Sequence, residues 1–95
     1  MNSKQRAYLK SLANTISPIF QVGKGGVSEE FINQIDSALE ARELIKIHVL
    51  NNSSDDINFV AEEISNKTSC EIVQIMGNKI TLFRQSIKKP KIELP

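Results

Sequence analysis

The sequence predicts a single α/β (α+β) domain with the order α-β-α-β-α-β-β around a four-stranded mixed sheet. The chain has 95 residues, which is the size of one ordinary domain. Apolar residues recur at helical spacing in three segments and at strand spacing in four others. The two inner helices are long enough to join parallel strands, whereas only two residues separate the last two strands, which must therefore be antiparallel.

The first half of the chain supplies two helices and one strand. Apolar residues at helical spacing predict a helix over residues 3 to 15 with Ser3 as its cap. Pro18 ends that pattern and opens a short strand at 18–22, a position where its missing N–H does least harm. The next helix starts after Ser28, a good N-cap that two glutamates follow at the positive end of the helix dipole.

The middle of the chain supplies a strand and a third helix. Residues 44–50 alternate between an apolar face and a polar face, and the polar face carries Lys46 and His48. Residues 51–54 are predicted to be a turn-rich linker. Capping aspartates and an apolar stripe then predict a helix over residues 55–67.

The last part of the chain is predicted to form a hairpin and a tail. Two β-rich runs, 70–76 and 79–84, flank Gly77-Asn78, a pair suited to a type II′ turn. After them the periodic pattern is lost. We therefore expect the folded domain to cover residues 1–86 and an extended basic tail to cover residues 87–95.

The composition excludes several classes of protein. With 40% hydrophobic and 24% charged residues, the chain is globular rather than disordered. No apolar run approaches the ~20 residues that span a bilayer, and no signal-peptide pattern opens the chain. One cysteine and one histidine form neither a disulfide nor a zinc site. We expect a cytoplasmic protein that has no membrane partner, metal or cofactor and is too small for a deep, lidded active site.

Charge is distributed unevenly along the chain. Residues 1–28 contain four basic residues and no acid, residues 29–71 contain ten acids against three bases, and residues 72–95 contain five bases against one acid. If the fold brings the two basic ends together, a nearly neutral protein can present a positive face to a polyanion. The alternative is that this segregation arose by chance in a short chain.

The chain has one glycine cluster, formed by Gly23, Lys24, Gly25 and Gly26 between a predicted strand and a predicted helix. Residues without Cβ let backbone N–H groups and the helix dipole approach an anion such as phosphate, and Lys24 adds a mobile positive charge. The alternative is that the glycines only make the bend. The spacing fits neither a Walker loop nor a dinucleotide fingerprint, but it fits the short G-x-x-G clamp of KH-type domains.

Several segments in order resemble one family, the CRM (CRS1-YhbY) family of RNA-binding domains. They are residues 5–10 (QRAYLK), 21–26 (QVGKGG), 35–40 (IDSALE), 43–47 (ELIKI), 73–80 (VQIMGNKI), 82–84 (LFR) and 92–95 (IELP). The last of them is similar to the end of free-standing bacterial YhbY-like proteins. The resemblance therefore covers nearly the whole chain.

This resemblance implies a fold similar to the C-terminal domain of translation initiation factor three, with a KH-like G-x-x-G loop that contacts RNA. Bacterial single-domain members are linked with precursors of the large ribosomal subunit. We therefore expect a monomeric, non-enzymatic RNA-binding protein that binds ribosomal RNA rather than DNA during large-subunit assembly. The expected RNA contacts are Gly23, Lys24, Gly25 and Gly26, extended by Arg6, Lys10, Lys79 and Arg84.

A second hypothesis is a protein-interaction adaptor. Glu29, Asp36 and Glu40 share one helix face and could recruit a basic ribosomal protein or a helicase, although the simplest explanation of that face is a solvated surface. His48 is either a solvated side chain or an RNA contact, and Cys70 is predicted to be a small buried hydrophobe. An aromatic content of 5% disfavours an RRM-type stacking sheet and favours recognition of the RNA backbone.

Overall fold

The computed structural model describes residues 1–51 and 55–95, so most of the predicted linker 51–54 lies outside the described residues. Its helices and strands follow the predicted order. They are α1 (Ser3–Ala13), β1 (Phe20–Val22), α2 (Glu29–Arg42), β2 (Leu44–Val49), α3 (Ile57–Thr68), β3 (Glu71–Met76) and β4 (Lys79–Phe83).

The four strands form one mixed sheet in the order β1-β2-β4-β3, which confirms the predicted fold class. β1 pairs with β2 in parallel, because α2 carries the chain back across the sheet between them. β4 lies between β2 and β3 and runs antiparallel to both. Gly77 has a φ of 61° while Asn78 does not have a positive φ, as a type II′ turn requires.

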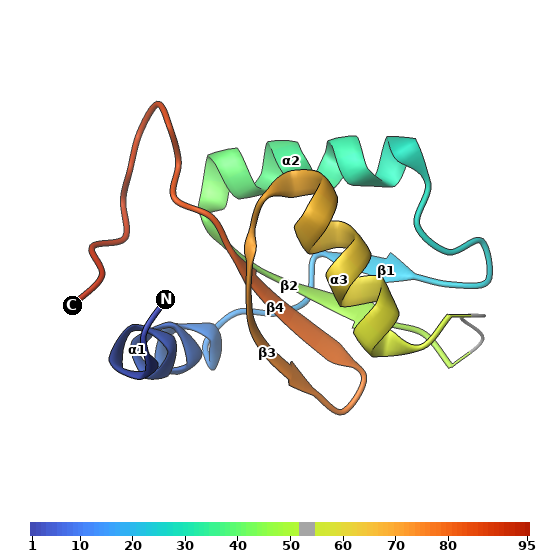
Figure 1. The fold of residues 1–95 in the computed structure, drawn as a ribbon, viewed down its shortest axis with the longest axis horizontal. Helices are drawn as coiled ribbons and strands as arrows, with labels where there is room; N and C mark the ends of the chain where they lie inside the picture. The colour runs from blue at the N-terminus through green and yellow to red at the C-terminus, as the bar shows by residue number, and fades with distance from the viewer. Residues whose placement is uncertain (52–54) are drawn as a thin grey trace.

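Helices cover the two faces of the sheet unequally. α2 and α3 lie together over one face, and α1 lies against one end of the other face (Figure 1). The odd-numbered residues of β2 and the apolar residues of α2 and α3 form the larger core. Leu9 and Ala13 of α1 pack with Leu44, Val73 and Phe83 in a smaller core on the opposite face. No helix formed by residues 1–51 or 55–95 covers the rest of that face.

The helix caps agree with the sequence at two of three starts. Ser28 accepts a hydrogen bond from the Phe31 N–H (3.0 Å), and Asp56 accepts one from the Asn58 N–H (3.1 Å). The prediction of Ser3 as the first cap is wrong, because Asn2 caps α1 instead. The Asn2 side chain accepts from the Gln5 N–H, and the Gln5 side chain accepts from the Asn2 N–H, so two orphan donors are satisfied reciprocally.

The chain after β4 contains no helix or strand, yet it is held against the domain. Ile92 packs into the smaller core, and the Gln5 Nε2 donates to the carbonyl oxygen of Pro95 (3.3 Å). The two termini therefore lie side by side (Figure 1). Within the described residues, no helix is long and apolar enough to cross a membrane.

Candidate nucleic-acid interface

The glycine cluster forms a tight turn at the end of β1. The Gly26 N–H donates to the Gly23 carbonyl oxygen (3.0 Å), which places Lys24 and Gly25 at the tip. Both tip residues are exposed, and among the described residues nothing accepts a hydrogen bond from either of their N–H groups. The tip therefore offers two adjacent backbone donors and one ammonium group to solvent.

The glycines of this turn serve different purposes. Gly26 has a φ of 68°, and an added Cβ would lie 3.3 Å from the Asp55 Oδ2, so the turn itself favours glycine there. Gly25 has a φ outside the left-handed region, and an added Cβ would meet no atom within 4 Å. The fold therefore does not require glycine at position 25, and its missing side chain leaves room for something outside the chain.

The N-terminus of α2 follows the turn but is not an open anion site. Ser28 already accepts one of its N–H groups, and Glu29 and Glu30 place two carboxylates in the first turn. These charges interact with the helix dipole in place of an external anion. The structure therefore gives less support to a phosphate bound by the dipole of α2 than to a phosphate bound by the turn at residues 23–26.

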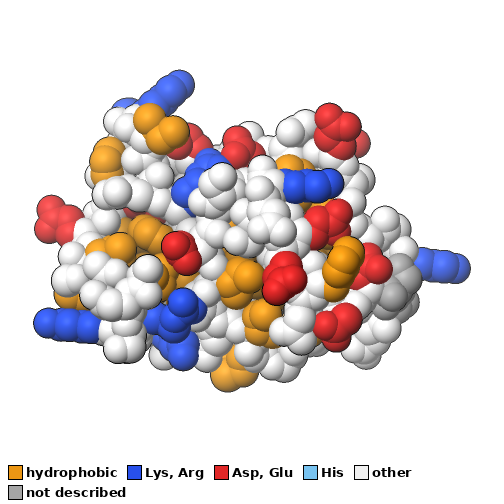
Figure 2. Space-filling view, in the orientation of Figure 1, with side chains coloured by type: hydrophobic (Ala, Val, Ile, Leu, Met, Phe, Trp, Pro, Cys, Tyr) orange, Lys and Arg blue, Asp and Glu red, His pale blue; other side chains and the backbone are white. Residues whose placement is uncertain are grey.

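The predicted basic residues divide between the two ends of the molecule. The turn of Lys24 lies at one end of the long axis, and α1 and the tail lie at the other (Figure 1). A basic side chain projects from the end that carries the turn (Figure 2). Lys79 is exposed on β4, two strands away from β1. Lys10 is half-buried on α1, away from the turn. The two basic ends of the chain do meet, but Lys24 is not with them.

Arg6 supports the sheet. Its Nη1 donates to the carbonyl oxygens of Ile72 (2.5 Å) and Val73 (2.9 Å). The pairing register of β3 shifts at this point, between Ile72 and Gln74. Such an irregularity leaves carbonyl groups without their ladder partners, and the guanidinium satisfies two of them.

Arg84 ties β4 to both helices on the opposite face. Its Nη1 donates to the Asp36 Oδ1 (2.6 Å) and the Thr68 carbonyl oxygen (2.8 Å), and its Nη2 donates to the Asp36 carbonyl oxygen (2.9 Å). Neither Arg84 nor Arg6 lies at the turn. Both arginines therefore use their donors within the fold, and their contact with RNA stays a prediction.

The acidic face of the adaptor hypothesis is partly used inside the protein. Asp36 pairs with Arg84, and Glu40 accepts hydrogen bonds from the Ser86 hydroxyl (2.5 Å) and the N–H groups of Ile87 and Lys88 (both 3.1 Å). These bonds, the hydroxyl first, lower the pKa of Glu40 to about 2. Of the three carboxylates, Glu29 alone has no such partner in the described structure.

Sequence reasoning missed Glu43, which is 0% exposed and has a φ of 67°. Its carboxylate accepts from the N–H groups of Ser86 (2.8 Å), Lys91 (2.9 Å) and Ile92 (2.7 Å). Burial by itself raises the pKa of Glu43, but these three donors outweigh it and leave the pKa below its ordinary value. Glu43 and Glu40 together hold the basic tail in place.

The remaining candidates have clear environments. Cys70 is buried in the larger core, and burial raises the pKa of its thiol, which confirms the prediction of a small hydrophobe. His48 is half-buried, with its Nε2 2.7 Å from the Asn78 Nδ2. Phe59, whose place the sequence does not explain, lies 56% exposed on α3.

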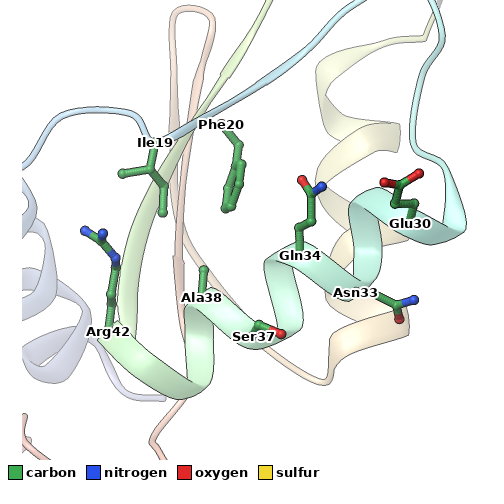
Figure 3. Close-up of a pocket in the computed structure, with 8 residues that line it drawn as sticks. All are labelled: Ile19, Phe20, Glu30, Asn33, Gln34, Ser37, Ala38 and Arg42. Atoms are coloured by element: carbon green, nitrogen blue, oxygen red, sulfur yellow. The ribbon is translucent and has the colours of Figure 1, made fainter.

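A groove of about 690 Å³ lies between β1 and α2 (Figure 3). It is lined by Ile19, Phe20, Glu30, Asn33, Gln34, Ser37, Ala38 and Arg42. Phe20 points from β1 toward the helix, and the two charged residues of the lining lie at opposite ends (Figure 3). This lining contains no nucleophile beside a base, so the groove offers no catalytic set.

The comparisons with known proteins agree with this picture. The family model of the CRS1 / YhbY (CRM) domain matches residues 1–84. The protein named "Probable RNA-binding protein YqeI" of Bacillus subtilis is 48% identical over 95 residues, which cover 100% of this chain and 99% of the relative. A Haemophilus influenzae protein named "RNA-binding protein" is 32% identical over 95 residues, 100% of this chain and 95% of its own.

A solved structure shows the same fold. The solution structure of a hypothetical Staphylococcus aureus protein is 52% identical, with a TM-score of 0.82, and the match covers 100% of this chain and 99% of that one. With a family model that spans most of its length and relatives that align end to end, the chain belongs to the CRS1 / YhbY (CRM) domain family.

Proposed function

We propose that the protein binds RNA without catalysing a reaction, and that the turn at residues 23–26 holds the RNA backbone. The observation that carries this proposal is the tip of the turn, where the N–H groups of Lys24 and Gly25 have no acceptor among the described residues and lie beside an ammonium group. Adjacent backbone donors and a flexible lysine suit a phosphate group. The RNA-binding names of full-length relatives support the same function.

We further propose that the RNA is ribosomal and that the protein acts in the cytoplasm, as a monomer, on precursors of the large subunit. The resemblance to bacterial single-domain CRM proteins supports this step. The adaptor hypothesis has less support, because Asp36 and Glu40 are already engaged within the chain.

The salt dependence of binding tests the turn. Each neutralised phosphate contributes about −0.7 to −0.9 to the slope of log K against log [salt]. Lys24→Ala should weaken binding to a ribosomal RNA fragment and flatten the slope by about one such unit. The control is Lys67→Ala, which removes the same charge from an exposed position on α3 that pairs with Glu63 (3.6 Å). Equal slopes for the two variants would refute a phosphate contact at Lys24.

Sedimentation tests the proposed ribosomal partner. The tagged protein should co-migrate with precursors of the large subunit and leave them after RNase treatment. If the protein still co-migrates with a purified protein after RNase treatment, the adaptor hypothesis is favoured instead. In-cell crosslinking to ribosomal RNA would then locate the site.

A further inference from the structure

The sheet face opposite α2 and α3 carries a row of side chains that crosses all four strands. Gln21 of β1 pairs with His48 of β2, His48 pairs with Lys79 of β4, and Lys79 pairs with Met76 of β3. Directly paired residues point to the same face of a sheet. The four side chains therefore form one line beside the turn that connects β3 and β4.

This row lies outside the area that α1 covers. α1 packs against Leu44 and Phe83 at the other end of the face, and it ends at Ala13, whose carbonyl oxygen accepts a hydrogen bond from the Lys46 Nζ (2.8 Å). Gln21, Lys79 and Met76 are exposed, and His48 is half-buried. Met76 is 65% exposed. These four side chains are therefore not part of the smaller core that α1 covers.

The row is adjacent to the proposed phosphate site. Gln21 precedes Gly23 by two residues, so β1 leads directly from the row into the turn. The first side chain of the row is therefore three residues along the chain from Lys24 at the tip of the turn. The register places Lys46, Thr81 and Gln74 in the next row, so no acidic residue belongs to either row.

The chemistry of the row suits an unpaired nucleobase. The amide of Gln21 and the ammonium of Lys79 can donate hydrogen bonds to base edges, and the imidazole of His48 offers a flat surface for stacking. Asn78 holds that ring from the side, with 2.7 Å between its Nδ2 and the His48 Nε2. The thioether of Met76 is polarisable and contacts aromatic rings favourably.

We propose that the row formed by Gln21, His48, Lys79 and Met76 holds unpaired RNA bases whose backbone is bound at residues 23–26. This inference rests on the proposed function and specifies its substrate as single-stranded RNA, including loops and bulges. The row contains no Phe, Tyr or Trp, so it differs from the stacking sheet of RRM domains, and its proposed base contacts are hydrogen bonds from Gln21 and Lys79 and stacking on the His48 ring. Bases within an A-form duplex are stacked on one another and cannot lie on this surface.

Binding to two RNAs tests the row. The probes are an unstructured 12-nucleotide RNA and a blunt duplex of the same length, each titrated against the wild type and His48→Ala/Met76→Ala. The wild type should prefer the single strand, and the variant should bind it about five- to tenfold more weakly. The salt slope should change less than it does for Lys24→Ala, because neither substitution removes a lysine or an arginine. The control is Phe59→Ala on α3, which removes a side chain of similar exposure from the opposite face.

Crosslinking gives a second readout that does not depend on affinity. A single strand that contains 4-thiouridine should form adducts on peptides that contain His48 or Met76. Thermal melts verify that the double variant is folded, and Met76→Ala alone is available if it is not.

The outcomes separate this inference from the proposed function. If the double variant binds the single strand like the wild type while Lys24→Ala still flattens the salt slope, the row is refuted and the phosphate contact stands. Equal affinity of the wild type for the duplex and the single strand would also refute the proposal that the row binds unpaired bases. If the wild type binds neither of these RNAs nor the ribosomal RNA fragment, both proposals fail.

Discussion

Replacing Glu43 by glutamine tests how the C-terminal chain is held. The carboxylate accepts three backbone N–H groups at 2.7–2.9 Å from a fully buried position. Glutamine keeps one acceptor oxygen, but its NH₂ group faces an N–H donor where the second oxygen was. A hydrogen bond to a charged group contributes about 1.5–3 kcal/mol. We therefore expect Glu43→Gln to lower the free energy of unfolding by about 2–3 kcal/mol.

For a domain of this length, that loss corresponds to a fall in Tm of roughly 10–20 °C. The assay is thermal unfolding followed by circular dichroism, with Glu62→Gln as the control, because Glu62 is exposed on α3. The reasoning is refuted if the two variants melt at the same temperature, since the buried carboxylate would then contribute no more than an exposed one.

The pH dependence follows from the lowered pKa of Glu43. A carboxyl group whose pKa is lower in the folded state stabilises the fold above its unfolded pKa, and it loses this effect as the pH falls through the folded value. The ordinary pKa of a glutamate side chain is 4.5. The gap in stability between wild type and Glu43→Gln should be constant above about pH 5.5 and narrow below about pH 4.5. Both proteins should continue to lose stability as the pH falls toward about 2, which is the pKa of Glu40.

Two further substitutions separate the fold from the interface. Gly25→Ala should leave the free energy of unfolding unchanged or raise it by up to about 1 kcal/mol, because alanine restricts the unfolded chain and meets nothing in the folded one. The same change should weaken RNA binding, and unchanged affinity would show that no close contact forms there. Arg84→Lys should lower the free energy of unfolding by about 1–3 kcal/mol in urea, because one ammonium cannot reach three acceptors. Lysine keeps the charge, so RNA affinity rather than the salt slope is measured at a temperature where the variant is folded. The affinity should be unchanged, and weaker binding would indicate an RNA contact at Arg84.

The elements of the fold could be predicted because their signals are local. Apolar spacing depends on residues within one or two turns, and the Ser28 cap depends on three neighbours. Their ends are less predictable because they depend on partners elsewhere in the chain. The strand expected at 18–22 begins at Phe20, where its pairing with Ile47 starts. The sequence does not show where that partner lies.

The tail could not be predicted for a similar reason. Helices commonly end at a residue with positive φ, and glycine is preferred there. Glu43 occupies this position after α2 with a φ of 67°, so local propensity argues against it. The unfavourable φ of Glu43 is offset by the hydrogen bonds that its carboxylate accepts from backbone N–H groups more than forty residues later in the chain. A glutamate at a position that favours glycine is the one sequence signal that could have identified it.

The basic residues show why charge alone could not define the interface. Arginine and lysine carry the same charge, but a planar guanidinium satisfies several fixed carbonyl oxygens at once, whereas an ammonium on a flexible stem is strongly hydrated. Arg6 donates hydrogen bonds to the two carbonyl groups beside the register shift in β3, and the sequence near Ile72 does not predict that shift. Lys24 is exposed, and no group in the described parts of the chain accepts a hydrogen bond from its ammonium. Because the fold uses the donors of Arg6 and Arg84, the exposed lysines are the better candidates for phosphate contacts in this chain.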